Sequence, residues 1–532
     1  MTENAEPNEA PHAMPDWARF ALAAVAVVPI LSTVFQTLVL TDVTDDVIRK
    51  GVEAEHYSML WSTVCWGVAI LYGVFAALWA MPRFGSRITL NVGLVLFALG
   101  NLLCGAAIDL TSLAAAKLVE GLGKGISMIL CRAVLYRQFD RALMVAIGFY
   151  GVCAYATRPA TPFVTALVND SLSWRWVFWS NVPLALLGLW LVRRFIKADR
   201  PPTPMLLQID WIGVTLLTAW IVSLLFLFSW YRKWGGWTSN IFSATAFLAM
   251  LLPVALLARV ASAYSRNEHL QRMLRVRLYI GAMSTRMLLL LELGAVLGLM
   301  ANYLVELRDF PRATAGLILA AATPAMAVAT LLTTVFHRRS LRFMWFLVGV
   351  AGSAGSLWWM SSVDNFTSKE QIAWMLGCWG LFVGLFPPVF LPTEVESLDR
   401  RDAMYGGAIA IVCLVLPLVL IPTAMGTVIS VWTDRALDTE RLNISENRPE
   451  VEAAQARIAD YFRQRGVDGP ELAQNTGRVL GTFVTVEAAS HGISSGLRFL
   501  SIVVGALGLL VGALLFKRPG MSASSPAAAP PK

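Results

Sequence analysis

Fourteen apolar runs, each close to the length that crosses a membrane, constrain this chain more than any other feature. A hydrocarbon core about 30 Å thick needs roughly 20 residues of helix, and inside it every backbone polar group must find its partner within the protein. We therefore predict an all-α polytopic membrane protein with 14 transmembrane helices. The runs cover residues 17–40, 57–81, 88–108, 111–135, 142–167, 174–193, 209–230, 238–260, 279–305, 313–336, 341–361, 370–393, 404–432 and 491–516.

Composition and motifs support a membrane protein without a cofactor. Hydrophobic residues make up 57% of the 532 residues and charged residues 15%, against about 45–50% and about 25% in globular chains. The six cysteines never occur in CxxC or CxxH spacing, so neither a zinc site nor a disulfide framework is expected. GLGKGIS at 121–127 lacks the first glycine and the Ser or Thr of a phosphate-binding loop. We expect no enzymatic activity, no cofactor and no metal.

The net charge of +8 is distributed as membrane topology predicts. Loops after even-numbered runs are basic, as in RFGSR (83–87), RRFIKADR (193–200) and HRRSLR (337–342), whereas loops after odd-numbered runs are short and mostly acidic. Lysine and arginine remain in cytoplasmic loops, so both termini are predicted to be cytoplasmic. Because the loops with clear charge follow the alternation that membrane topology predicts, we expect no nucleic-acid partner.

The longest polar stretch, residues 434–490, separates the last two runs. Within it Val451, Ala454, Ile458 and Phe462 recur three or four residues apart, which predicts a short amphipathic helix. A second helix can begin at Pro470, because proline is well suited to the first helical turn. We expect this stretch to pack as a cap over the outer mouth, with a substrate-facing element as the alternative.

Several segments resemble the major facilitator superfamily, and specifically its fourteen-span branch of drug:proton antiporters. SWRWVFWSNVP (173–183) is similar to that family's S-W-R-W-x-F-x-x-N-V-P. RFGSRITLNVGLVLFALGNLLCG (83–105) resembles the R-x-G-R-R segment and the apolar span after it, and SLAAAKLVEGLGKG (112–125) resembles the R-x-x-Q-G-x-G-x-G fourth span. The chain is identified as a divergent member of this branch.

The resemblance implies a major facilitator fold, with two six-helix bundles and two inserted helices between them. Substrate would bind near the bilayer midplane, and rocking of the bundles would give alternating access. The expected divisions are a cytoplasmic tail (1–16), an N-terminal six-helix bundle (17–195), two inserted helices (207–262), a C-terminal six-helix bundle (277–517) with the periplasmic loop 434–490, and a disordered cytoplasmic tail (518–532).

Two segments hold candidate gating residues. Arg83, Gly85 and Arg87 remain from the family's loop pattern between the second and third spans. In the fifth span, Pro159 and Pro162 interrupt the backbone hydrogen bonds of a helix. The two prolines predict a flexible gate helix.

The fourth span carries four charges on one face. At about 100° per residue, Lys117, Glu120, Lys124 and Arg132 fall within an arc of about 120°. A charge facing lipid costs at least about 2.5–3.5 kcal/mol, so this face should line a bundle interior or an aqueous cavity. Glu120 can pair with either lysine and is a proton-site candidate, because Ser32 stands where the resemblance places an acid. A purely structural ion cluster is the alternative.

Three further charges lie within spans: Arg158 in the fifth, and Arg286 and Glu292 in the ninth. Arg286 and Glu292 lie about 240° apart around the helix, so each needs a partner elsewhere. Glu292 is the second proton-site candidate; the alternative is that it neutralises an arginine across the bundle interface. The candidate substrate-binding residues are Lys117, Lys124, Arg132, Arg158 and Arg286. These five basic groups face two acids, which predicts a cavity that attracts an anion.

Together these features predict a proton-coupled secondary active exporter of a small anionic amphiphile or metabolite, working by alternating access in a bacterial inner membrane. A proton symporter or importer of a small metabolite is the alternative within this class, and a transport-dead membrane sensor is the alternative from another class. The expected partners are the small-molecule substrate, protons and membrane lipid. We expect a monomer, either alone or with periplasmic adaptor proteins.

Overall fold

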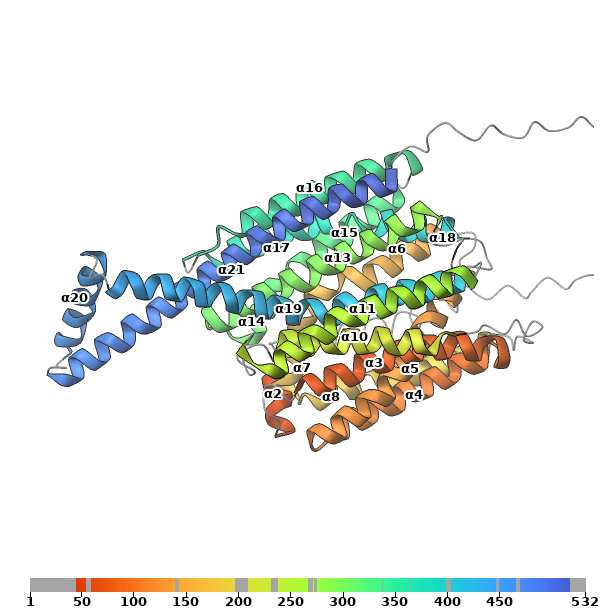
Figure 1. Cartoon of the computed structure of the whole chain (residues 1–532), viewed down its shortest axis with the longest axis horizontal. Coiled ribbons are helices and arrows are strands. Elements are labelled where there is room, and N and C mark those ends of the chain that lie inside the picture. Colours follow the sequence, from red (N-terminus) through yellow and green to blue (C-terminus); the bar gives the residue numbers. More distant parts are fainter. Residues whose placement is uncertain are drawn as a thin grey trace, which may run out of the picture.

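The computed structural model describes residues 45–53, 59–138, 143–196, 209–230, 238–266, 271, 275–336, 338–364, 366–398, 403–445, 449–465 and 469–516. All regular elements in these segments are helical (Figure 1). The prediction of an all-α protein is therefore confirmed.

Every predicted span after the first overlaps a helix or a run of helices, and ten candidate spans are long and apolar enough to cross a membrane. The first predicted span, 17–40, lies outside the described residues, so the total of 14 stays a prediction. The elements are α2 (Asp45–Gly51), α3 (Leu60–Phe84), α4 (Ser86–Ala106), α5 (Leu110–Gln138), α6 (Leu143–Gly151), η3 (Val152–Ala156), η4 (Arg158–Ala160), α7 (Thr161–Ser171), α8 (Arg175–Trp179), α9 (Asn181–Phe195), α10 (Trp211–Ser229), α11 (Asn240–Arg266), α13 (Arg277–Asn302), η6 (Tyr303–Leu307), α14 (Arg312–Ala320), α15 (Ala322–Val335), η7 (Arg339–Leu341), α16 (Arg342–Met360), α17 (Lys369–Val383), α18 (Pro387–Glu396), α19 (Ala403–Ser445), α20 (Pro449–Arg463) and α21 (Pro470–Phe516).

The helices fall into an N-terminal group, α2 to α9, and a C-terminal group, α13 to α21. In Figure 1 the red and orange helices α3 and α4 lie below the green to blue helices of the C-terminal group, whereas α6 lies beside α18. Helix α10 contacts α3 on one side and α19 on the other. The rings of Tyr72 and Trp211 stack at 6.2 Å between α3 and α10, and Thr427 of α19 donates a 2.6 Å hydrogen bond to the carbonyl of Phe228. Helix α10 therefore covers one seam between the groups.

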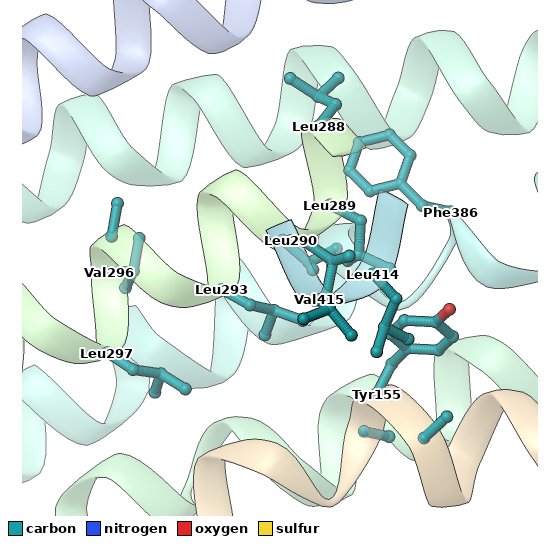
Figure 2. Packing of buried hydrophobic residues seen from close by; sticks show 14 of the residues in the cluster. Tyr155, Leu288, Leu289, Leu290, Leu293, Val296, Leu297, Phe386, Leu414 and Val415 are labelled. Carbon is teal, nitrogen blue, oxygen red and sulfur yellow. The ribbon is translucent and has the colours of Figure 1, made fainter. Parts of the chain in front are cut away.

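The centre of the molecule is formed by α13 and by the run α17–α18. In each of these two spans 72% of the apolar window is buried, against 17% in α11, which lies at the periphery. Figure 2 shows leucines of α13, among them Leu289 and Leu293, packed with Leu414 of α19 and with Tyr155 of η3. Tyr155 belongs to the N-terminal group, so one apolar core runs across both groups. Burial of this shared core holds the groups together.

Glycines of the GLGKG segment allow α5 to pack closely against α4. A Cβ on Gly123 would overlap the backbone of Phe97 in α4, and a Cβ on Gly100 of α4 would overlap the backbone of Glu120. Because these glycines have no side chain, the backbones of α4 and α5 can approach closely. Small residues commonly allow such close packing of helices in membranes. This approach fixes the rotation of α5 and with it the direction of the charged face.

The α-helix of the fifth span is interrupted near Pro159 and Pro162, as these prolines predict. An α-helical segment, α6, gives way to the π-helical turn η3 and the 3₁₀ turn η4 before α7 begins. Pro159 lies in η4 and Pro162 lies in the first turn of α7. The two prolines cannot supply backbone N–H groups to a continuous helix, which accounts for the break.

The polar stretch 434–490 forms a projecting hairpin and not a cap. Helices α19 and α21 contain 43 and 47 residues, so each is about 65–70 Å long at 1.5 Å per residue. That is roughly twice the thickness of a hydrocarbon core. Both helices continue past the other helices on one side, where α20 packs against α21 (Figure 1). The amphipathic helix and the helix start at Pro470 are confirmed.

Replacing Gly100 with Ala should destabilise the packing of α4 on α5. The added methyl group has no room against the backbone of Glu120, and such overpacking costs typically about 1–3 kcal/mol. We expect a lower apparent melting temperature of the purified protein, followed by tryptophan fluorescence in detergent. Gly355→Ala is the matched control, because a Cβ on Gly355 of α16 meets nothing within 4 Å. Equal melting of the two variants would contradict this packing.

Candidate functional site

The four charged residues predicted to share one face of α5 are all shielded from the surroundings. Lys117, Glu120 and Lys124 are 1%, 0% and 0% exposed, and Arg132 is 6% exposed. The prediction that this face avoids lipid is confirmed. The structure nevertheless divides the four residues between two sites, because Arg132 turns toward the other helix group.

The first site lies inside the N-terminal group and pairs two lysines with aromatic rings. Lys124 Nζ lies 3.4 Å from Glu120 Oε1 and 4.9 Å from the ring centre of Trp66 on α3. Lys117 Nζ lies 4.7 Å from the ring of Phe178 on α8 and 5.9 Å from the ring of Trp66. Within the described part of the chain, Lys117 Nζ has no hydrogen-bond acceptor. Cation–π contacts, which are stronger away from water, therefore stabilise its charge.

The second site joins the two helix groups through Glu394 of α18. Glu394 Oε1 lies 2.5 Å from Arg132 Nη2 of α5, and its other carboxylate oxygen accepts a hydrogen bond from Arg286 Nη2 of α13. Arg286 Nη1 also donates to the carbonyl of Ala410 in α19, at 2.9 Å. One carboxylate thus bridges a guanidinium of the N-terminal group and a guanidinium of the C-terminal group. We call Arg132, Glu394 and Arg286 the arginine–glutamate bridge.

Aromatic rings surround this bridge. The guanidinium carbon of Arg132 lies 5.7 Å from the ring centre of Tyr150, and that of Arg286 lies 5.0 Å from the ring centre of Phe390. Tyr155 meets Phe390 edge to face at 5.6 Å. These rings come from both helix groups and exclude water from the ion pairs. Exclusion of water strengthens the attraction between the charges and raises the cost of separating them.

Glu292 occupies a third site, in the middle of α13. It is completely buried and accepts hydrogen bonds from Ser353 Oγ of α16 at 3.2 Å and from Trp379 Nε1 of α17 at 3.3 Å. Among the described residues no cation pairs with it. The structure thus gives Glu292 two neutral donors, and the arginine of the same helix, Arg286, has its partner in Glu394. Both residues find partners elsewhere, as their angular separation predicts.

Arg158 lies at the break of the fifth span and is 5% exposed. Its Nε donates to the carbonyl of Ala154 at 3.0 Å, and its guanidinium lies 5.8 Å from the ring of Tyr155. Nη2 has no hydrogen-bond acceptor among the described residues. Arg158 is therefore a buried donor group close to the interface between the helix groups.

The candidate gating residues of the first basic loop make contacts within the N-terminal group. Arg83 donates a 2.6 Å hydrogen bond to the carbonyl of Trp79, one turn earlier. Gly85 has a φ of 84°, a conformation that favours glycine, and it makes the turn between α3 and α4. Arg87 donates to the carbonyl of Arg193 at 2.7 Å and ties α4 to the end of α9. A gating role for this loop stays a prediction.

Sequence reasoning missed Glu394, the residue that the bridge depends on. The twelfth span predicted from the sequence, 370–393, ends one residue before Glu394. The structure buries it at 2% exposure and continues α18 to Glu396. Glu394 raises the number of buried acids among the described site residues from two to three, against five buried basic candidates. The paired prolines at 387 and 388, which restart a helix shortly before it, were the available signal.

Apolar spanning helices in two groups, with buried ion pairs between and within them, define a polytopic helical membrane protein. A family model described as Major Facilitator Superfamily matches residues 20–422. The chain belongs to this superfamily of membrane transporters.

Curated relatives resemble only part of the chain. "Multidrug resistance protein 3" of Bacillus subtilis is 28% identical over 182 residues, 34% of this chain and 35% of the relative. The "Acurin A biosynthesis cluster MFS-type transporter" of Aspergillus aculeatus is 26% identical over 343 residues, 61% and 60% of the two chains. The "Multidrug resistance protein B homolog" of Mycobacterium tuberculosis is 25% identical over 274 residues, 51% and 49%. The chain thus spans between about a third and three fifths of these relatives.

Replacing Glu394 with Gln should destabilise the protein strongly. The change leaves two buried guanidinium groups without their carboxylate, and removing one partner of a buried ion pair costs about 3–5 kcal/mol. We expect a marked fall in the melting temperature in detergent.

Glu396→Gln is the control for this change. Glu396 lies two residues after Glu394 in α18. Its side chain is 25% exposed and lies 2.7 Å from the guanidinium of Arg342. Exposed or partly exposed pairs contribute about 0–1 kcal/mol. If both variants melted at the same temperature, the bridge would contribute no more to stability than a partly exposed ion pair does.

Proposed function

We propose that the chain is a proton-coupled secondary active exporter of small organic anions, either amphiphiles or metabolites, in a bacterial inner membrane. Membership of the superfamily supports transport by alternating access between two helix groups. The names of the relatives, which include multidrug resistance proteins and a transporter of a biosynthesis cluster, support export. These relatives come from bacteria and from a fungus, so the bacterial location is part of the proposal.

The observation that carries proton coupling is the environment of Glu292. A carboxylate without a counter-ion is costly to bury, and the two donors around Glu292, Ser353 and Trp379, are neutral. A proton is the smallest ligand that removes this cost. Alternating exposure of Glu292 to the two sides of the membrane would let it take up a proton on one side and release it on the other.

Glu120 is the second candidate for proton coupling. It lies 3.4 Å from Lys124, so its charge is already partly balanced in this structure. Movement of a proton at Glu120 would change the charge of the lysine site and hence its attraction for an anion. We therefore assign Glu292 the main role and Glu120 a linked one.

The preference for anions rests on the buried basic groups. Lys117 and Arg158 each keep a donor nitrogen without an acceptor among the described residues, and both lie beside aromatic rings. A ligand that combines a carboxylate with an apolar ring would satisfy the donors and pack against the rings. Five basic groups against three acids give these sites a net positive charge, which concentrates anions.

Glu292→Gln should uncouple transport from the proton gradient. Glutamine keeps an oxygen that can accept from Ser353 and Trp379 but cannot take up a proton. In proteoliposomes we expect loss of organic-anion transport driven by a pH gradient, while exchange of substrate for substrate continues. The measurement compares both modes for a panel of aromatic carboxylates.

The matched control is Glu306→Gln, an exposed acid at the end of the same helical run. This variant should retain both transport modes. Gradient-driven transport at the wild-type rate in Glu292→Gln would refute the assignment. If Glu120→Gln abolished gradient-driven transport and Glu292→Gln did not, the proton-coupling residue would lie in the N-terminal group.

Lys124→Ala and Arg158→Ala should each reduce transport of an anionic dye such as fluorescein. Loss of one buried positive charge lowers the attraction for an anion, by about tenfold or more in rate. Transport in proteoliposomes is compared with that of the cationic dye ethidium, and Lys369→Ala, which removes a lysine that is 60% exposed, serves as the control. Preference for ethidium, unaffected by either substitution, would show that the cavity does not select anions.

A further inference from the structure

The arginine–glutamate bridge must change whenever the helix groups separate on its side of the molecule. Arg132 lies a few residues before the basic loop 137–141, and Glu394 lies a few residues before the basic loop 399–401. This side carries the basic loops and is the predicted cytoplasmic side. Arg286 and Glu394 both belong to the C-terminal group and remain together when the groups part, whereas Arg132 leaves with the N-terminal group.

The bridge is therefore asymmetric. In the closed state Glu394 is shared by two guanidiniums, and in the open state it retains Arg286 while Arg132 loses the carboxylate. Arg132 is a permanent cation, since a guanidinium does not lose its proton in proteins. A guanidinium also binds a carboxylate better than a lysine does, because its planar donors match the two oxygens. On opening, the guanidinium nitrogen that contacts Glu394 becomes accessible to water or to another anion.

The closed structure already shows which chemistry this position accepts. A carboxylate, that of Glu394, lies against Arg132 at 2.5 Å, with the ring of Tyr150 5.7 Å from the guanidinium and the pair of rings Tyr155 and Phe390 close by. A free carboxylate attached to an apolar ring would repeat these contacts. Glu394 thus occupies the site as an internal carboxylate.

We propose that Arg132 is a binding site for carboxylate-bearing substrates on the predicted cytoplasmic side, which Glu394 fills in the closed state and the substrate fills in the open state. This inference rests on the proposed function, since it assumes that the two helix groups part during transport. Substrate and Glu394 compete for one guanidinium. Substrate binding therefore favours the open state, and release of substrate lets Glu394 close it again.

The test uses benzoate as the ligand and benzamide as its uncharged counterpart, with the purified full-length chain in detergent. In Glu394→Gln the internal competitor is gone, so the apparent Kd for benzoate, from thermal stabilisation, should fall at least about tenfold below the wild-type value. Benzamide should stabilise neither protein. Adding Arg132→Gln to Glu394→Gln should remove the gain, and Glu396→Gln should bind benzoate as the wild type does. An unchanged Kd in Glu394→Gln, or a gain that survives Arg132→Gln, would overturn the proposal.

If Glu394→Gln does not fold, a distance measurement on the protein with Glu394 intact tests the same proposal. Ile88 of α4 and Phe343 of α16 are 55% and 43% exposed and lie near the basic loops of the two groups. With spin labels on cysteines at these positions, in a background whose six native cysteines are replaced by alanine, benzoate should shift the inter-label distances to longer values. Benzamide should not. An unchanged distance distribution would also overturn the proposal.

Failure of this site and failure of the proposed function give different results. If aromatic carboxylates are transported in proteoliposomes but benzoate binding does not depend on Arg132 or Glu394, only the site is wrong. If benzoate competes with Glu394 but no transport occurs in either direction, the site stands and the exporter assignment falls. The two experiments therefore test the two statements separately.

Discussion

The carboxylate of Glu394 lies between two arginines that belong to different helix groups, and it links the two groups by charge. Within the described part of the chain this ion pair joins α5 to α18, and aromatic rings from both groups surround it. Separating such a pair in a dry environment is expensive unless another partner replaces it. Under the proposed mechanism, opening therefore requires a substitute for Glu394, and bound substrate supplies it.

The other buried charges are arranged so that each helix group keeps a site of its own. The lysines of α5 rely on Glu120 and on the rings of Trp66 and Phe178, all within the N-terminal group. Glu292 relies on neutral donors of the C-terminal group. These contacts can persist while the groups move, whereas the bridge cannot. Under the proposed mechanism, the sites within one group keep their partners during movement, whereas the bridge exchanges one of its partners.

Much of the fold follows from the sequence, and the limits are physical. Apolar runs of membrane-spanning length predict the helices because lipid forces the backbone to pair within each segment, and the angular position of Lys117, Glu120 and Lys124 predicts their burial. Hydropathy cannot place Glu394, because a charged residue one position beyond an apolar run reads as loop whether or not a helix continues. Nor does it predict the aromatic partners of the lysines, which are distant in sequence, or the hairpin of α19 and α21, since a helix can continue after its apolar residues end.

The coupling between Arg132 and Glu394 is the most direct test of this account. A double-mutant cycle with Arg132→Gln, Glu394→Gln and the combined variant, followed by unfolding of the purified protein, measures the interaction between the two side chains apart from their other contacts. We predict that the combined variant is more stable than the sum of the single changes by about 0.5–3 kcal/mol, the range seen for residues in one ionic network. Additive effects would show that the two residues do not depend on each other, and would contradict the bridge as the contact that holds the groups closed.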